Sequence, residues 1–314
     1  MAKKRPSIGS SKNRKGSMRS PTPSSEVPAT FEVRGYKFGG FGTENPDAKL
    51  AGVDLSGKEL VRSVLTRADL KGAKLDSAGL SGANLVDADL SNASLVGTYL
   101  VNAKLAGAKF VGAVLRGADL SQVNLSYVED WDDDGETFER LHTPCNFEGA
   151  DLSGASLRSI RGFRSSFAGV TLNGADLSSQ TFLFDGDVDP MNLLSVLDEA
   201  NFDAASMTNV SLVCARLRAA SLRRAVLRGA DLSGADLRDA DLTDADLTGA
   251  LLFGGRLKWE GSGTQHDRAV KGARLAGAKL SGAILVGVDL AGVDLTDVDL
   301  RRAILRDDFG STDH

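Results

Sequence analysis

The chain has 314 residues, of which 42% are apolar and 25% are charged, and its formal net charge is −5. This length and apolar content allow a substantial core, and two cysteines are too few for a disulfide framework, so a reducing cytoplasm is the expected compartment. No apolar run reaches the ~18 residues of a transmembrane helix, and no signal-peptide core follows the basic N-terminus, which argues against a membrane partner.

Residues 1–30 differ in character from everything after them. They hold seven Lys or Arg and one Glu, whereas the remainder holds 30 basic and 41 acidic residues. A segment rich in Ser, Pro, Lys and Arg with little to bury is predicted to be a disordered basic tail. Three interpretations stay open: a solubilising or expression-derived tail, a basic arm that contacts nucleic acid or an acidic partner, and a transit or nuclear signal.

Residues 31–45 are predicted to be an N-terminal cap. The repeats that begin at about residue 46 form an open-ended stack (below), and the first layer of such a stack needs a cover for its core and its unpaired strand edges. Bulky side chains suited to this task stand among glycines: Phe31, Val33, Tyr36, Phe38 and Phe41.

Residues 46–306 follow a period of five, with leucine at every fifth position and alanine two places before it. On an α-helix, where each residue turns ~100°, leucines at this spacing would scatter around the barrel, and on a flat strand they would alternate faces. They all face inward only if the chain bends once per repeat, so that short strands and corners build stacked coils. The leucines expected in the core include Leu70, Leu90, Leu120, Leu232, Leu237, Leu242, Leu247 and Leu290.

The run A-[DN]-L-x-x resembles the repeat of the pentapeptide-repeat proteins. It occurs as Ala68-Asp69-Leu70, as Ala83-Asn84-Leu85 and as Ala235-Asp236-Leu237, among many others. The resemblance implies an all-β fold, a right-handed quadrilateral parallel β-helix with four repeats and twenty residues per coil. It says little about function, because one fold serves many functions.

Three segments interrupt the period, at residues 126–144, 183–195 and 258–270, and residues 307–314 are a C-terminal tail. The first is an acidic loop. The second suggests a capped short helix and stays open between an imperfect coil and a true insertion; the third is expected to be a flexible loop. Because loops on a rigid scaffold often carry binding residues, the predicted partner-binding residues are Glu129, Asp130, Trp131, Asp132, Asp133, Asp134, Glu136 and Trp259.

Catalytic and cofactor motifs are not found. The sequence has no phosphate-binding glycine loop and no nucleophile elbow, and the repeated aspartates fall on successive faces of the rod. The sequence therefore favours a protein that is not an enzyme, with no catalytic residue and no cofactor. One metal hypothesis remains: Asp130, Asp132 and Asp134 match the start of a calcium loop, but Leu141 stands where the bidentate glutamate belongs, so an acidic contact loop is preferred.

Charge changes sign along the third run of repeats. Five arginines occur from Arg216 to Arg228 without an acid, and six aspartates with one arginine occur from Asp231 to Asp246. Neighbouring coils can pair these charges, or they can form a patch for a partner. Pairing between coils is the preferred interpretation.

The resemblance also implies a function. Some pentapeptide-repeat proteins mimic duplex DNA and bind type II topoisomerases, so the expected partner is DNA gyrase or another type II topoisomerase, modulated or protected from inhibitors as in antibiotic resistance. Direct binding of duplex DNA to the rod is not expected, and the C-terminal helix through which such relatives dimerise is not found after Leu305. The alternative is a rigid protein–protein interaction scaffold that acts through its loops and has no topoisomerase partner.

Overall fold

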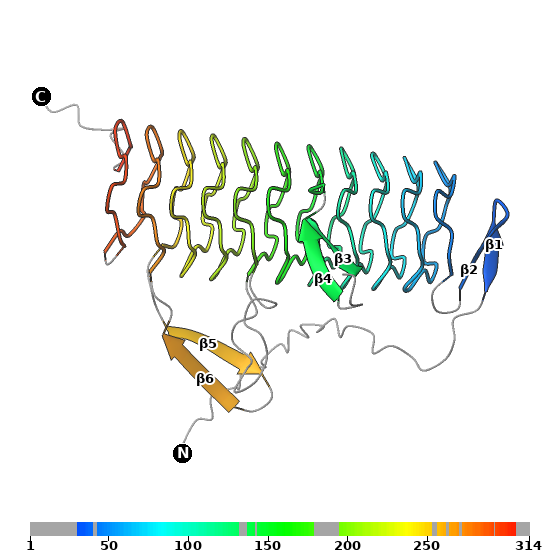
Figure 1. Cartoon of the computed structure of the whole chain (residues 1–314). Coiled ribbons are helices and arrows are strands. Elements are labelled where there is room, and N and C mark those ends of the chain that lie inside the picture. The colour runs from blue at the N-terminus through cyan, green and yellow to red at the C-terminus, as the bar shows by residue number, and fades with distance from the viewer. Residues whose placement is uncertain are drawn as a thin grey trace, which may run out of the picture.

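The computed structural model describes residues 30–39, 43–131, 137–141, 143–178, 195–252, 256–261, 264–269, 272–291 and 293–305. The chain winds into a straight stack of similar coils with a short hairpin at its N-terminal end (Figure 1). Within these ranges no helix is long and apolar enough to cross a membrane.

The coils are joined by parallel bridges between residues one coil apart. Lys49 pairs with Asp69, Asp54 with Lys74, and so on around the coil, so that each coil has four short faces. The hydrogen bonds alternate in direction: the Leu50 amide donates to the Asp69 carbonyl at 2.8 Å, and the Asp69 amide donates to the Ala48 carbonyl at 2.9 Å. The period of five thus gives one face per repeat, because each repeat supplies one bridge and one corner.

Each corner is a tight turn between two faces. In the corner after Leu50, the Leu50 carbonyl accepts a hydrogen bond from the Val53 amide at 3.1 Å. The second corner residue has positive φ, as at Gly52 (67°), a conformation that glycine adopts without strain. Asparagine and aspartate also stand there, for example Asn92 and Asp87. The corners therefore explain why glycine recurs two residues after the leucine.

The aspartate before each leucine caps the corner that follows. The Oδ1 atom of Asp89 accepts from the Ser91 amide at 3.1 Å, and Asp246 accepts from the Thr248 amide at 3.0 Å. Such side-chain turns are typical of Asp and Asn. Asp246 is buried, so the repeated carboxylates are structural acceptors as well as surface charges.

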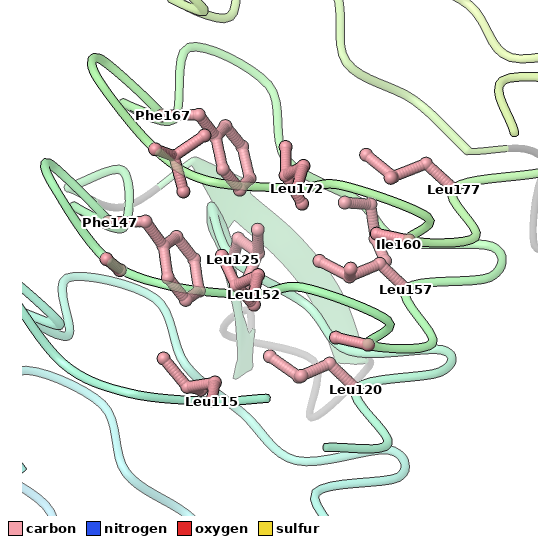
Figure 2. Packing of buried hydrophobic residues seen from close by; sticks show 14 of the residues in the cluster. Leu115, Leu120, Leu125, Phe147, Leu152, Leu157, Ile160, Phe167, Leu172 and Leu177 are labelled. Atoms are coloured by element: carbon pink, nitrogen blue, oxygen red, sulfur yellow. The ribbon is translucent and has the colours of Figure 1, made fainter. Parts of the chain in front are cut away.

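Leucines and alanines fill the narrow interior (Figure 2). Seven of the eight leucines named from the sequence are almost completely buried, which confirms their assignment to the core: Leu70, Leu90, Leu120, Leu232, Leu237, Leu242 and Leu247. The eighth, Leu290, is partly buried and packs against this core. It lies in the last described coil, where Leu305 is 52% exposed and no further described coil covers the interior.

Phenylalanine replaces leucine in one interior column. Phe110, Phe147, Phe167 and Phe202 stack on four successive coils, with ring centroids 4.7, 5.1 and 4.8 Å apart and nearly parallel planes. These distances match the spacing of paired strands, ~4.8 Å, so each ring lies directly on the next without disturbing the coils.

A two-stranded antiparallel hairpin packs at the N-terminal end of the stack. It consists of β1 (Phe31–Val33) and β2 (Tyr36–Phe38), in which Phe31 pairs with Phe38. Phe38 is fully buried, and the Lys58 ammonium lies 5.4 Å from the centre of the Phe31 ring. The hairpin is also tied to the first coil, because the Lys49 amide donates to the Tyr36 hydroxyl at 3.1 Å.

Two further antiparallel hairpins leave the stack. The first joins β3 (Tyr127–Trp131) to β4 (Thr137–Leu141), and the second joins β5 (Arg256–Gly261) to β6 (Thr264–Ala269). The two segments were expected to be an acidic loop and a flexible loop, and the structure instead has paired strands in both. The reason is local sequence: both segments place aromatic or β-branched residues on either side of a short stretch that contains glycine, which is typical of hairpins.

Candidate interaction face

Four ladders of parallel bridges run along the stack, one on each face of the coils. One of them differs from the others because all three extra segments of the chain lie at the corners beside it. We call it face A; its bridging residues are Glu44, Val64, Asn84, Lys104, Asn124, Arg161, Val196, Arg216, Asp236, Arg274 and Asp294. The step along this ladder is twenty residues except at Asn124 to Arg161, Arg161 to Val196 and Asp236 to Arg274, where it is longer.

All three longer steps arise at corners that border face A. The first extra segment follows Asn124, where the chain leaves face A, and the other two precede Val196 and Arg274, where the chain enters it. In Figure 1 the hairpin β3–β4 is drawn across the coils and the hairpin β5–β6 below them. Face A is therefore the side of the rod on which the regular repeat is elaborated.

The predicted partner-binding residues fall in or beside these hairpins. Glu129, Asp130 and Trp131 are in β3, where Glu129 pairs with Glu139 and Asp130 with Phe138. Trp259 is in β5, opposite His266. Asp132, Asp133, Asp134 and Glu136 lie outside the described residues.

Two of the three aspartates of the calcium hypothesis, Asp132 and Asp134, therefore lie outside the described residues. The same holds for residues 1–29, for the short helix expected within residues 183–195, of which only Ser195 is described, and for the tail 307–314. Within the ranges described above, no three His, Cys, Asp or Glu side chains gather as metal ligands. Cys145 is buried among apolar groups, and this burial raises the pKa of its thiol well above the usual value, which disfavours the reactive thiolate.

Ion pairs connect neighbouring coils over much of the rod. Arg223 lies 2.9 Å from the Asp203 carboxylate and Arg228 lies 2.5 Å from the Asp246 carboxylate, each pair joining adjacent coils. These pairs support the structural interpretation of the alternating arginines and aspartates. Their arginines are more than half exposed, so each pair contributes about 0–1 kcal/mol to stability.

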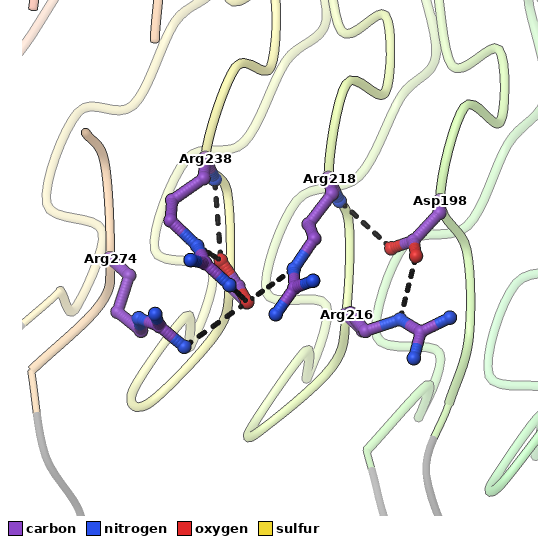
Figure 3. Close-up of polar contacts among 6 residues, drawn as sticks. Asp198, Arg216, Arg218, Arg238 and Arg274 are labelled. Carbon is purple, nitrogen blue, oxygen red and sulfur yellow. Dashed lines mark hydrogen bonds and ion pairs between the residues drawn. The ribbon is translucent and has the colours of Figure 1, made fainter. Parts of the chain in front are cut away.

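On face A this one-to-one pairing gives way to a cluster. Three arginines converge on the single carboxylate of Asp236 (Figure 3). Arg238 donates to both of its oxygens at 2.8 and 2.7 Å, Arg218 donates to Oδ2 at 2.8 Å, and the Nη1 atom of Arg274 lies 3.3 Å from the same Oδ2. We call Arg218, Asp236, Arg238 and Arg274 the Asp236 cluster.

The environment of Asp236 keeps it ionised. Burial by itself would raise the pKa of Asp236, but hydrogen bonds from Arg238 and Arg218 and the charge of Arg274 hold that pKa well below its usual range. The carboxylate is thus a fixed negative charge at all ordinary pH values, and three guanidinium groups share it.

A second pair stands next to this cluster on the preceding coil. The Nε atom of Arg216 lies 2.6 Å from the Asp198 carboxylate, although its N–H is not in hydrogen-bonding geometry, and the Arg218 amide donates to Asp198 at 3.0 Å (Figure 3). Four arginines and two aspartates therefore meet, and two exposed carboxylates, Asp239 acting on Arg238 and Asp294 acting on Arg274, balance the two remaining positive charges.

Sequence reasoning identified the arginines near Asp236 but not the cluster. Arg274 follows the third extra segment, and its place beside Asp236 is set only by the resumed ladder. A sequence signal existed in principle, because Ala273-Arg274-Leu275 restarts the repeat and must occupy the face after Leu251, which is face A.

With this geometry established, the fold defines the class: a four-sided parallel β-helix built from five-residue repeats. The sequence matches the family described as pentapeptide repeats, in eight copies, over residues 47–82, 83–122, 145–179, 195–224, 220–258 and 271–307. The chain belongs to the pentapeptide-repeat family, whose fold is a right-handed β-helix. No curated protein matches it.

Solved structures of the same family align over most of the chain. HetL from the cyanobacterium Nostoc sp. strain PCC 7120, involved in heterocyst differentiation regulation, is 26% identical over 83% of this chain and 91% of HetL, with a TM-score of 0.38. Trypsin-treated QnrB1, a plasmid-mediated fluoroquinolone resistance protein, is 15% identical over 82% of this chain and 93% of its own, with a TM-score of 0.35. Neither superposes closely, and nothing about the function of this chain follows from them.

Proposed function

We propose that the protein is a non-catalytic binding rod that engages a protein partner along face A and the hairpins beside it. The observation that carries this proposal is the position of the three extra segments, all of which border one face of an otherwise uniform stack. A rigid stack presents such segments at fixed distances from one another, as repeat proteins do with their binding surfaces.

Charge favours a protein partner over nucleic acid. The segment from residue 127 to residue 141 carries seven acidic residues and one arginine, which would repel a phosphate backbone. Face A beside it carries the arginines of the Asp236 cluster. A surface with both signs in separate places suits a protein with complementary patches.

Within this proposal, a type II topoisomerase such as DNA gyrase is the first partner to test, because the family resemblance implies it. The faces of the stack give no support to mimicry of DNA along the rod. The most acidic ladder, from Glu59 to Leu251, has no basic residue, yet its acids, Glu59, Asp119, Asp176 and Asp231, stand two or three coils apart. At ~4.8 Å per coil this is one charge in roughly 10–14 Å, against one per ~1.7 Å in duplex DNA. A topoisomerase would therefore be contacted through the acidic hairpin β3–β4.

A supercoiling assay tests whether the protein acts on a topoisomerase. Purified gyrase is assayed with an excess of the protein, with and without a quinolone. We expect altered supercoiling or less drug-stabilised cleavage, and we expect the effect to weaken when Asp132, Asp133 and Asp134 are all changed to Asn. No change in either activity with the parent protein eliminates the topoisomerase and leaves the scaffold.

Site-specific photo-crosslinking tests the face itself. A photoreactive residue at Ala276, at the corner beside face A, is compared with one at Val286, at the diagonally opposite corner of the same coil; both positions are half-buried corner sites. In its native host the protein should crosslink to a defined partner from Ala276 and not from Val286. Equal crosslinking from both positions, or none from either, would refute binding through face A.

A further inference from the structure

We propose that the Asp236 cluster is the site on face A that binds an acidic peptide segment of the partner protein. This inference rests on the proposed function, since it assumes a protein partner, and it adds the chemistry of the contact: carboxylate side chains held by the guanidinium groups of Arg218, Arg238 and Arg274.

The arginines of the cluster use only part of their hydrogen-bonding capacity on Asp236. A guanidinium group has five N–H donors in a planar fork. Arg218 and Arg274 each direct one nitrogen at the Oδ2 atom, and their side chains are 46% and 49% exposed. Since Arg238 also donates to Oδ2, that oxygen already receives all three arginines, and the remaining donors of Arg218 and Arg274 are available to a second carboxylate.

The cluster exceeds what is needed to join coils. Elsewhere on the rod one arginine serves one carboxylate, as Arg228 does with Asp246. Three cations around one buried anion repel one another, and exposed anions lower this repulsion, as Asp239 does at Arg238 and Asp294 at Arg274. Arg218 and Arg274 link Asp236 to the two neighbouring coils, and among the described residues Asp236 alone receives three arginines.

The neighbouring segments narrow the choice of anion. The acidic segment that begins at Tyr127 borders the same face, so a polyanion as dense as nucleic acid meets repulsion there. A peptide with a few carboxylates can place them on the cluster and turn away from the acidic hairpin. Arginine forks also match carboxylate geometry better than a point charge does.

The test uses a fluorescein-labelled peptide with three glutamates separated by glycine and serine, and the full chain at low salt, with binding followed by fluorescence anisotropy. We expect Arg274→Ala to weaken binding about three- to tenfold, as loss of one exposed or half-exposed charge-assisted contact does. The matched control is Arg228→Ala, which removes the arginine of the Arg228–Asp246 ion pair on another face and should change binding less than twofold. The basic tail is present in every variant, so its contribution cancels in the comparison.

Several outcomes overturn the inference. Equal weakening by Arg274→Ala and Arg228→Ala shows unspecific attraction, and tighter binding of a labelled DNA duplex through Arg274 assigns the cluster to nucleic acid. Thermal melting verifies that both variants fold, and Arg274→Lys, which keeps the charge without the fork, should bind with intermediate strength. If crosslinking from Ala276 succeeds while the peptide does not distinguish the variants, the face is retained and the cluster is rejected.

Discussion

Replacement of Leu237 by aspartate tests the packing of the core, to which each face of a coil contributes a single leucine. Leu237 is fully buried, its amide donates to the Arg274 carbonyl at 2.8 Å, and the column in which it stands continues through Leu217 and Leu275. Loss of a buried leucine side chain costs about 2–5 kcal/mol. The aspartate must also be neutral to stay inside, and protonating it at pH 7 from an unfolded pKa of ~3.9 costs about 4 kcal/mol.

The total, about 6–9 kcal/mol, is comparable with the whole stability of an ordinary domain, ~5–15 kcal/mol. Because a solenoid is stabilised mainly by contacts between adjacent coils, we expect the coil to open locally and the urea transition to divide into two. Leu237→Asn loses the same leucine without the charge. At pH 7 it should be more stable than the aspartate variant by up to about 4 kcal/mol.

The dependence of stability on pH separates the penalty for the buried charge from the loss of the leucine. A buried aspartate has its pKa raised in the folded state, so its penalty is present above the unfolded pKa and disappears as the pH falls to about 4. The Asp and Asn variants should therefore converge near pH 4, while Leu237→Ala remains destabilised by a similar amount at both pH values. A urea midpoint of the aspartate variant equal to that of the parent would refute the inward orientation of the leucines.

Two other predictions concern the ring stack and the corners. Phe167→Ala should lower the free energy of unfolding by about 3–5 kcal/mol, whereas Phe167→Leu should cost only about 1 kcal/mol because leucine fills this column in other coils; equal losses in urea denaturation would contradict the stack. Hydrogen bonds from the Arg301 side chain and amide lower the pKa of Asp299 to about 2, and the pKa values of Asp54 and Asp294 are also lowered. This stabilisation is complete above the unfolded pKa of ~3.9 and is lost as the pH falls toward 2, so the melting temperature should decrease between pH 4 and pH 2, and a constant value would show that the capped carboxylates do not matter.

The core could be predicted from the sequence because one local rule repeats over long runs. Leu232, Leu237, Leu242 and Leu247 each stand in the same surroundings, and a short-range pattern determines them all. The degree of burial of Leu290 is a different matter, because the pattern does not state which coil is the last to be covered.

The Asp236 cluster and the hairpins were not predicted from the sequence, for two different reasons. The position of Arg274 depends on the face at which the ladder resumes after an insertion, and no local property of the inserted residues fixes it. The strands β5 and β6 were hidden for another reason: glycines and a mixture of polar residues suggested a flexible loop, although Trp259 and Leu257 alternate with polar residues as in a strand.

The corner cap formed where aspartate or asparagine precedes the inward leucine or phenylalanine separates the charge of the rod from its fold. Asparagine performs the same task as aspartate: the Oδ1 atom of Asn84 accepts from the Val86 amide at 3.2 Å, and that of Asn146 accepts from the Glu148 amide at 2.8 Å. One atom exchanged in the side chain thus removes a negative charge and leaves the backbone unchanged. Exchange of Asp and Asn at these positions can make the surface of such a rod more or less acidic, one face of one coil at a time. Surface charge, and with it the choice of partner, can therefore vary between proteins of this fold while the stack stays the same.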